Sequence, residues 1–208
     1  MVCHSQRGLL YPLTIGDEVN FRLTYDGPLK AASQSDPRRK PKHEMRRVFS
    51  RQLHELHSVK DDFLDQETDP LEEAIVRRGD FLFLALVRKS LDLVCDLDIL
   101  FLRRENPGEL IHSGGDLDNR IKVLFDALRI PQNEDEVRDF QPEPPKKKEL
   151  ILCLTEDDKQ ITGFRVTTDR LLKPALSEAE QHHVQLIINV EIKATRLTDR
   201  NLRYFSHF

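Results

Sequence analysis

The chain has 208 residues, of which 38% are hydrophobic and 33% are charged, and its formal net charge is −4. This length supports one substantial hydrophobic core, and we expect a single domain over residues 1–208. No apolar run reaches the length of about 18 residues that a membrane span needs, and the first residues lack a signal-peptide core, so we expect a cytoplasmic chain with no membrane contact.

The first elements along the chain are a tail, a strand and a basic helix. The tail covers residues 1–18, and the alternation over Val19–Tyr25 predicts a strand. The Asp-Gly-Pro sequence at 26–28 predicts a turn. Apolar residues at helical spacing then predict a helix over about Pro41–Val59.

A basic cluster precedes and enters this helix. Its candidate DNA-contacting members are Arg38, Arg39, Lys40, Lys42, Arg46 and Arg47. The net negative charge of the chain argues against nucleic-acid binding, but segregated charge of this kind fits a local DNA-facing patch. It fits an ordinary solvated helix equally well. An acidic insertion over residues 60–79 follows the helix.

Strands dominate the rest of the chain. The predicted strands are Phe81–Val87, Leu91–Arg103, a short one beginning at Val137–Phe140, Glu149–Thr155, Ile161–Thr167 and Val184–Ala194. A proline- and lysine-rich linker covers 141–148. Cys95 and Cys153 lie in apolar strand patterns without metal-ligand spacing, so we expect reduced thiols in the core.

The helix that starts near Gly115 carries the clearest candidate site. Asp118, Lys122 and Asp126 fall at i, i+4 and i+8 on one side, and an apolar stripe lies opposite. Asp116 stands at or before the helix N-cap, where the helix dipole favours negative charge. This side can be a simple salt-bridge ladder. However, a ladder requires neither Asp116 nor Asn119, and aspartate is a poor helix former at position 126.

Clustered carboxylates beside one lysine suit a divalent metal ion. Mg²⁺ prefers hard oxygen ligands and keeps some positions for water and phosphate oxygens. A neighbouring lysine can offset the charge that develops on a phosphate. A second Asp-Leu-Asp sequence, Asp96 to Asp98, lies in an alternating strand, and we interpret its carboxylates as the solvent face of that strand with no metal role.

The sequence Asp-Leu-Asp-Asn-x-x-Lys-x-x-x-Asp-Ala-Leu over 116–128 resembles the signature of the RusA family of Holliday-junction resolvases, which are small dimeric Mg²⁺-dependent endonucleases of bacteria and phages. In that family a short turn and an Asp-Asp-x-Gln-Val-like run follow the motif helix. Here Asn133–Phe140 occupies that place. If Val137 is aligned, Glu134 takes the position of the third catalytic acid and Asp135 is its neighbour.

The resemblance implies an active site made from the motif helix and the turn after it. Metal ligation is implied for Asp116, Asp118 and Glu134 or Asp135, and phosphate contact for Lys122. We interpret Asn119 and Asp126 as groups that orient these ligands and the lysine. The implied cofactor is Mg²⁺, with Mn²⁺ as a substitute. The implied partners are branched DNA and a second copy of the chain.

The implied fold is α+β, a small mixed sheet packed by two main helices as in the RusA family, with the acidic insertion and an extra C-terminal strand. The implied function is structure-selective hydrolysis of four-way DNA junctions. An alternative is a RusA-like DNA-binding or interaction protein that does not cut, which the sequence pI near 6.1 and the glutamate at 134 favour. A further alternative is a domain unrelated to nucleic acids in which the motif is only a salt-bridge ladder.

Overall fold

The computed structural model describes residues 19–29, 39–59, 74–104, 117–138, 140–142, 148–172 and 182–205. The side chains of 39–41, 57–59 and 203–205 are outside that description. The predicted tail, residues 60–73 of the predicted acidic insertion and residues 143–147 of the predicted linker lie outside the described residues. So do Arg38 and Asp116.

The described chain is a mixture of strands and helices. The strands are β1 (Val19–Pro28), β2 (Val76–Arg78), β3 (Phe81–Val87), β4 (Leu93–Arg103), β5 (Glu149–Thr155), β6 (Ile161–Arg170) and β7 (His183–Ala194). The helices are α1 (Arg39–Val59), α3 (Leu117–Leu128) and α4 (Asp199–Phe205), with short 3-10 turns η2 (Lys89–Leu91), η3 (Glu134–Glu136) and η4 (Asp158–Gln160).

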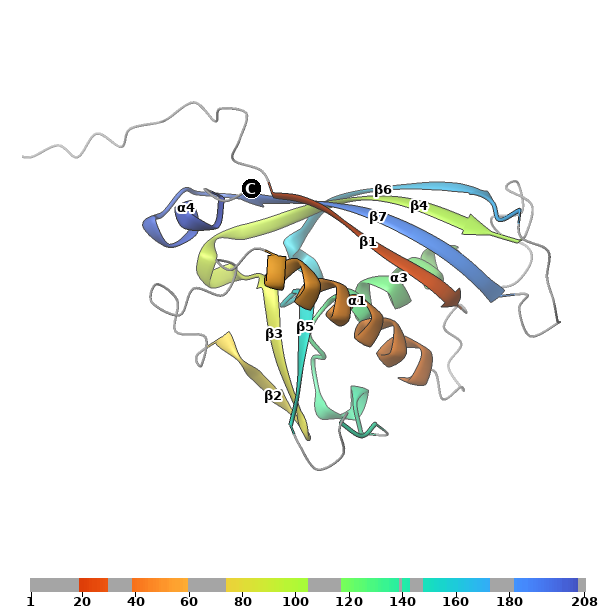
Figure 1. Ribbon diagram of the computed structural model, residues 1–208, viewed down its shortest axis with the longest axis horizontal. Coiled ribbons are helices and arrows are strands. Elements are labelled where there is room, and N and C mark those ends of the chain that lie inside the picture. The colour runs from red at the N-terminus through yellow and green to blue at the C-terminus, as the bar shows by residue number, and fades with distance from the viewer. Residues whose placement is uncertain are drawn as a thin grey trace, which may run out of the picture.

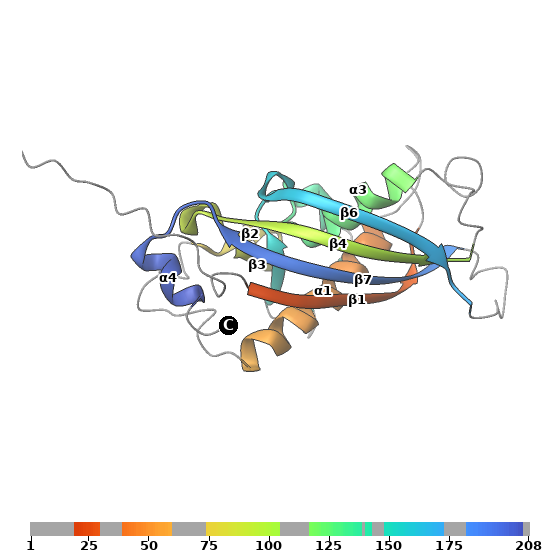
Figure 2. The same cartoon turned by 90° about the horizontal axis from the view of Figure 1, so that it is seen from above.

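The larger sheet has four strands in the order β1-β7-β4-β6. β7 pairs antiparallel with both β1 and β4, whereas β4 and β6 run parallel, so β6 is an edge strand. Figure 1 shows α1 and α3 beneath one face of this sheet. Figure 2, which views the sheet from above, shows the four strands side by side with α3 near β6.

A second sheet of three strands, in the order β2-β3-β5, stands below the first (Figure 1). Strands β3 and β5 are parallel and carry buried side chains on both faces. Strands buried on both faces read as continuous apolar runs, which explains why both were predicted with their observed bounds. The α+β class is confirmed, but the single mixed sheet that we expected is two sheets.

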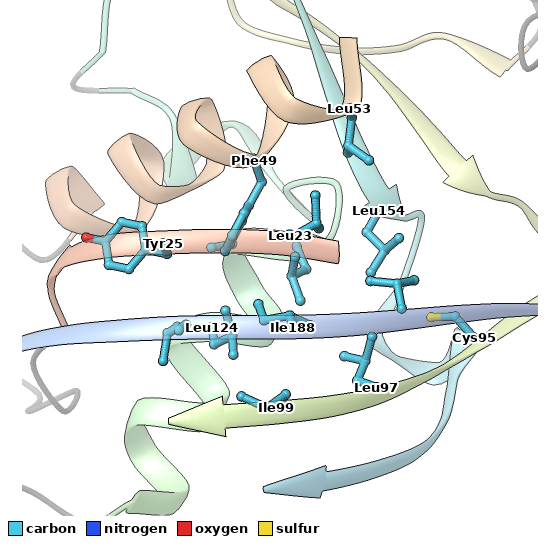
Figure 3. Close-up of a cluster of buried hydrophobic side chains, with 14 of the residues drawn as sticks. Leu23, Tyr25, Phe49, Leu53, Cys95, Leu97, Ile99, Leu124, Leu154 and Ile188 are labelled. Atoms are coloured by element: carbon cyan, nitrogen blue, oxygen red, sulfur yellow. The ribbon is translucent and has the colours of Figure 1, made fainter. Parts of the chain in front are cut away.

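The main core lies between the four-stranded sheet and the two helices, as Figure 3 shows. Phe49 and Leu53 enter it from α1, and Leu124 enters it from α3. The facing sheet contributes side chains such as Leu23 and Ile188. All five are at most 2% exposed, so α3 is fixed to the sheet by its apolar side.

Strand β1 runs through the Asp-Gly-Pro sequence that predicted a turn. Its last residues remain paired with β7, and Gly27 faces Val184. A Cβ at Gly27 would lie 2.7 Å from the hydroxyl of Tyr25, which donates a hydrogen bond to the Pro28 carbonyl. A side chain at position 27 would therefore displace the Tyr25 hydroxyl. The turn prediction is wrong, because this segment continues as a strand paired with β7.

Two further boundaries differ from the sequence prediction. Val137 ends a 3-10 turn instead of beginning a strand, and its side chain packs into a smaller apolar cluster with Ile130. Helix α4 follows β7 and was not predicted. Cys95 and Cys153 are buried free thiols, as expected. Among the described helices, none is both long and apolar enough to cross a membrane.

Candidate functional site

Helix α3 separates a buried side from a charged side. The buried residues are Arg120, Ile121, Val123, Leu124, Ala127 and Leu128. Asp118 and Lys122 are exposed, and Asn119 is half-buried. Asp118 stands in the first turn, where the positive end of the helix dipole stabilises a carboxylate. The predicted motif helix is therefore confirmed as a helix, with Asp118 and Lys122 one turn apart on its outer surface.

The exposed side of α3 continues to Phe125, which is three residues after Lys122. The Phe125 ring meets the Phe164 ring of edge strand β6 edge-on, with 5.2 Å between centroids and 87° between planes. Positions 118, 122 and 125 follow i, i+4, i+7 spacing and thus share one side of the helix. The candidate site borders the open edge of the larger sheet.

Asp126 has a different environment from Asp118. Its carboxylate lies 3.2 Å from the Lys42 ammonium of α1 and also accepts a hydrogen bond from Arg129. The backbone carbonyl of Asp126 accepts a hydrogen bond from the Arg46 guanidinium at 2.7 Å. Asp126 therefore ties the end of α3 to α1.

Glu136 of η3 enters the same group of charges. One carboxylate oxygen lies 3.3 Å from Lys42, and the other lies 3.3 Å from Arg129. The Arg46 guanidinium is 3.9 Å away. We refer to Lys42, Arg46, Asp126, Arg129 and Glu136 as the α1–α3 charge cluster. It joins α1, the end of α3 and the turn that follows, and no contact of Asp126 within the described chain supports its predicted role of orienting metal ligands.

The charge cluster changes the interpretation of the basic helix. Arg46 is fully buried, so its predicted place on a DNA-contacting surface is wrong. Lys42 and Arg47 are 16% and 12% exposed, and both pair with carboxylates, Lys42 in the cluster and Arg47 with Glu149 at 3.0 Å. We therefore remove all three from the candidate DNA contacts, because burial and ion pairs within the protein already use their charge.

Arg38 lies outside the described residues, and Arg39 and Lys40 begin α1 with side chains outside the description.

The turn after α3 presents acids in two directions. Glu134 and Asp135 are exposed, and Asp135 forms an ion pair with Arg138. Glu136 points inward, and its backbone N–H donates to the Asn133 side chain, which caps η3. Glu136 was not among the predicted site residues. The available signal was an asparagine followed three residues later by a glutamate, the spacing of an N-cap and its capping-box partner.

The structure describes some of the predicted metal ligands. Asp118 and Glu134 supply exposed carboxylate oxygens of the kind that Mg²⁺ prefers, while Asp116 lies outside the described residues. Within the stretches that the structure describes, no three acidic, histidine or cysteine side chains form a group that could hold a metal ion. The convergence of Asp116, Asp118 and Glu134 or Asp135 on one ion therefore stays a prediction.

The second Asp-Leu-Asp sequence lies on the opposite face of the sheet from α3, because Leu97 between its two aspartates points into the core. Asp96 pairs with Lys193 at 2.9 Å and accepts a hydrogen bond from Thr162. These hydrogen bonds, that of Lys193 first, lower the pKa of Asp96. An open hollow of about 540 Å³ covers this region. The solvent-face interpretation of Asp96 and Asp98 is confirmed.

Comparison of the chain with protein-family models, with curated proteins and with solved structures finds no match.

Proposed function

We propose that the protein is a Mg²⁺-dependent, structure-selective DNA endonuclease that hydrolyses phosphodiester bonds at four-way junctions. The observation that carries the proposal is the position of Asp118 and Lys122, one turn apart on the exposed side of a helix whose other side is locked in the core. A carboxylate and an ammonium group held this close together can bind a metal ion and a phosphate at adjacent points.

The rigidity of α3 supports the same proposal. A site for phosphodiester hydrolysis needs side chains that keep their positions while the substrate binds. Leu124 anchors the middle of α3 in the core, and Asp126 and Arg129 anchor its end in the α1–α3 charge cluster. The exposed side of α3 is therefore held in a fixed position relative to the core.

The resemblance to the RusA family names the groups around the metal. Asp118 would hold Mg²⁺ together with Asp116 and with Glu134 or Asp135. A bound Mg²⁺ supplies Lewis-acid activation of the phosphate and lowers the pKa of water. Lys122 would contact the phosphate and oppose the charge that develops there.

A homodimer is part of the proposal. A two-fold dimer would present two α3 sites to a junction that itself has two-fold symmetry, which permits paired cuts. Sedimentation equilibrium should give a particle of twice the 24.3 kDa of one chain. A mass of one chain at micromolar concentration would remove the dimer from the proposal.

A second candidate is a junction-binding protein that does not cut. It is favoured by the ion pair between Asp135 and Arg138, which occupies one of the two acids expected to complete the metal site. It is also favoured by the exposure of Glu134 on a separate 3-10 turn from α3.

One experiment separates the two candidates. Mg²⁺ and, separately, Mn²⁺ are titrated into the protein with a synthetic four-way junction, a fork or a linear duplex of equal length, and both binding and cleavage are measured. We expect divalent-dependent cleavage of the junction in preference to the duplex. Tight junction binding without cleavage in the presence of either metal would favour the second candidate. Equal binding and cleavage of all three DNAs would contradict structure selectivity.

A further inference from the structure

Phe164 is an aromatic side chain left in solvent on the edge strand of the larger sheet. It is 58% exposed, although β6 lies beside the main core. Its ring contacts Phe125, which is itself half-buried on the exposed side of α3. The two aromatic rings thus form a small apolar surface next to the side of α3 that carries Asp118 and Lys122.

The register of β6 shows which of its side chains share this surface. Leu97, Ile99 and Phe101 of β4 point into the core, and their partners on β6 are Phe164, Val166 and Thr168. The next position on this face is Arg170, which is exposed and has no ion pair with any described residue. Phe164 and Arg170 therefore both project on the α3 side of the sheet.

Helix α3 and strand β6 run in opposite directions beneath and along this edge. Arg129, just after α3, forms a bridge with Thr155, and η4 links the end of β5 to the start of β6. The end of α3 is thus near the start of β6. Along α3 from Phe125, Lys122 and Asp118 therefore lie in the direction in which β6 runs from Phe164 to Arg170. Figure 2 shows α3 beside β6.

We propose that Phe164 is a base-stacking residue of the candidate site and receives an unstacked nucleobase at the branch point of the DNA. This inference rests on the proposed function and deepens it. Every nucleobase has a face that stacks on an aromatic ring, and such contacts are independent of sequence. A junction or fork supplies unpaired or strained bases at its centre, whereas a linear duplex does not.

The charges beside Phe164 favour a nucleic acid over an apolar partner. Lys122 is exposed and pairs with no described carboxylate, and Arg170 extends the same surface. Proteins that bind single-stranded nucleic acids combine aromatic rings, which stack on bases, with cations on the same surface, which bind phosphates.

The test uses a four-way junction with 2-aminopurine at the branch point, in buffer with EDTA so that no cleavage occurs. The full chain is compared as wild type, F164L, F164Y and L202A. Leucine keeps the apolar bulk without the aromatic face, and tyrosine keeps the face. Leu202 on α4 is the matched control, because it is also an exposed apolar side chain, at 52%. Figure 1 shows α4 at the end of the larger sheet away from α3.

We expect 2-aminopurine fluorescence to rise when wild type binds, because the base leaves the DNA stack. F164L should lose this rise and bind the junction about tenfold or more weakly, while F164Y and L202A should behave as wild type within about threefold. F164L with wild-type affinity and fluorescence overturns the inference, and so does a wild type that binds no DNA. A wild type with the Phe164-dependent signal but no cleavage in Mg²⁺ or Mn²⁺ refutes the endonuclease and leaves the stacking role standing.

Discussion

His43 of α1 lies fully buried among aromatic rings. It stacks on Phe140 at 4.0 Å between centroids and meets Phe81 edge-on at 5.1 Å. Neither of its ring nitrogens has a hydrogen-bond partner among the described residues. Burial first, and then the charges of Arg46 and Arg47, lower the pKa of His43 from 6.5 to about 3.

This shift predicts acid sensitivity with a defined sign. Between pH 6.5 and about 3 the unfolded chain binds a proton at His43 that the folded protein does not, so stability falls as the pH falls through that range. The contribution from pH 7 to pH 5 is about 2 kcal/mol of unfolding free energy. Urea unfolding of wild type and H43F at both pH values measures it. Equal losses in the two proteins would contradict the assignment.

Lys122 has the most direct predicted role in the chemistry of any described cation. Its ammonium group is exposed on α3, so replacing it removes charge without opening the core. K122M should reduce junction cleavage by about 100-fold, the effect of removing one donor that stabilises developing charge. Its unfolding free energy should stay within about 0.5 kcal/mol of wild type. K159M, which removes an exposed lysine from η4, is the control and should retain activity.

Among the elements, helix α3 is fixed by two sets of contacts. The turn after it carries one acidic side chain that points inward and others that are exposed. The main core fixes the buried side of α3, and the α1–α3 charge cluster fixes its end. Glu136 belongs to this cluster, whereas Glu134, two residues earlier in η3, faces solvent. The two glutamates should therefore have separate effects on stability and on activity.

E136Q leaves Lys42, Arg46 and Arg129 with Asp126 as their remaining partner in the cluster. We expect it to lower the unfolding free energy by about 2 kcal/mol or more, since breaking a largely buried ion pair leaves charge uncompensated. E134Q should change stability by less than about 0.5 kcal/mol and reduce Mg²⁺-dependent cleavage instead. Urea unfolding and cleavage rates of both variants test these expectations. An E136Q variant with the unfolding free energy of wild type would show that the cluster does not stabilise the fold.

Local sequence patterns predicted the elements well where one pattern dominated. The apolar runs of β3 and β5 and the alternation of β7 gave elements close to those observed. The pairing of β3 with β5 could not be predicted, because it joins segments far apart in the sequence. The Asp-Gly-Pro sequence looked like a turn because its pairing with β7 joins residues more than 150 positions apart, as Gly27 with Val184 shows.

The sequence also predicted part of the candidate site. The helical spacing placed Asp118 and Lys122 correctly on one exposed side of α3. The spacing could not show that Asp126 and Arg46 belong to an internal charge cluster. The contacts of Asp126 with Lys42 and Arg46 join two helices that are far apart in the sequence. Phe164 gave no functional signal in the sequence, because its exposure results from the place of β6 at the sheet edge.

For the whole molecule, the net charge of −4 means that the proposed DNA binding requires a small local basic surface. Lys42, Arg46 and Arg47 of the basic cluster are engaged inside the protein. We therefore take the exposed side of α3 and the neighbouring edge of β6 as the proposed DNA-binding surface. The opposite face of the larger sheet carries Asp96 and Asp98 and lies outside the proposed DNA-binding surface.

The central claim is that the first turn of α3 is a metal-dependent cleavage site. The most direct measurement is the rate of four-way junction cleavage in Mg²⁺ by wild type, D118N and D98N, with folding checked by thermal unfolding. D118N should lose about 100-fold or more, because a metal ligand is removed, while D98N, the same change on the opposite face of the sheet, should stay within about twofold. A folded D118N that cuts at the wild-type rate would contradict the account.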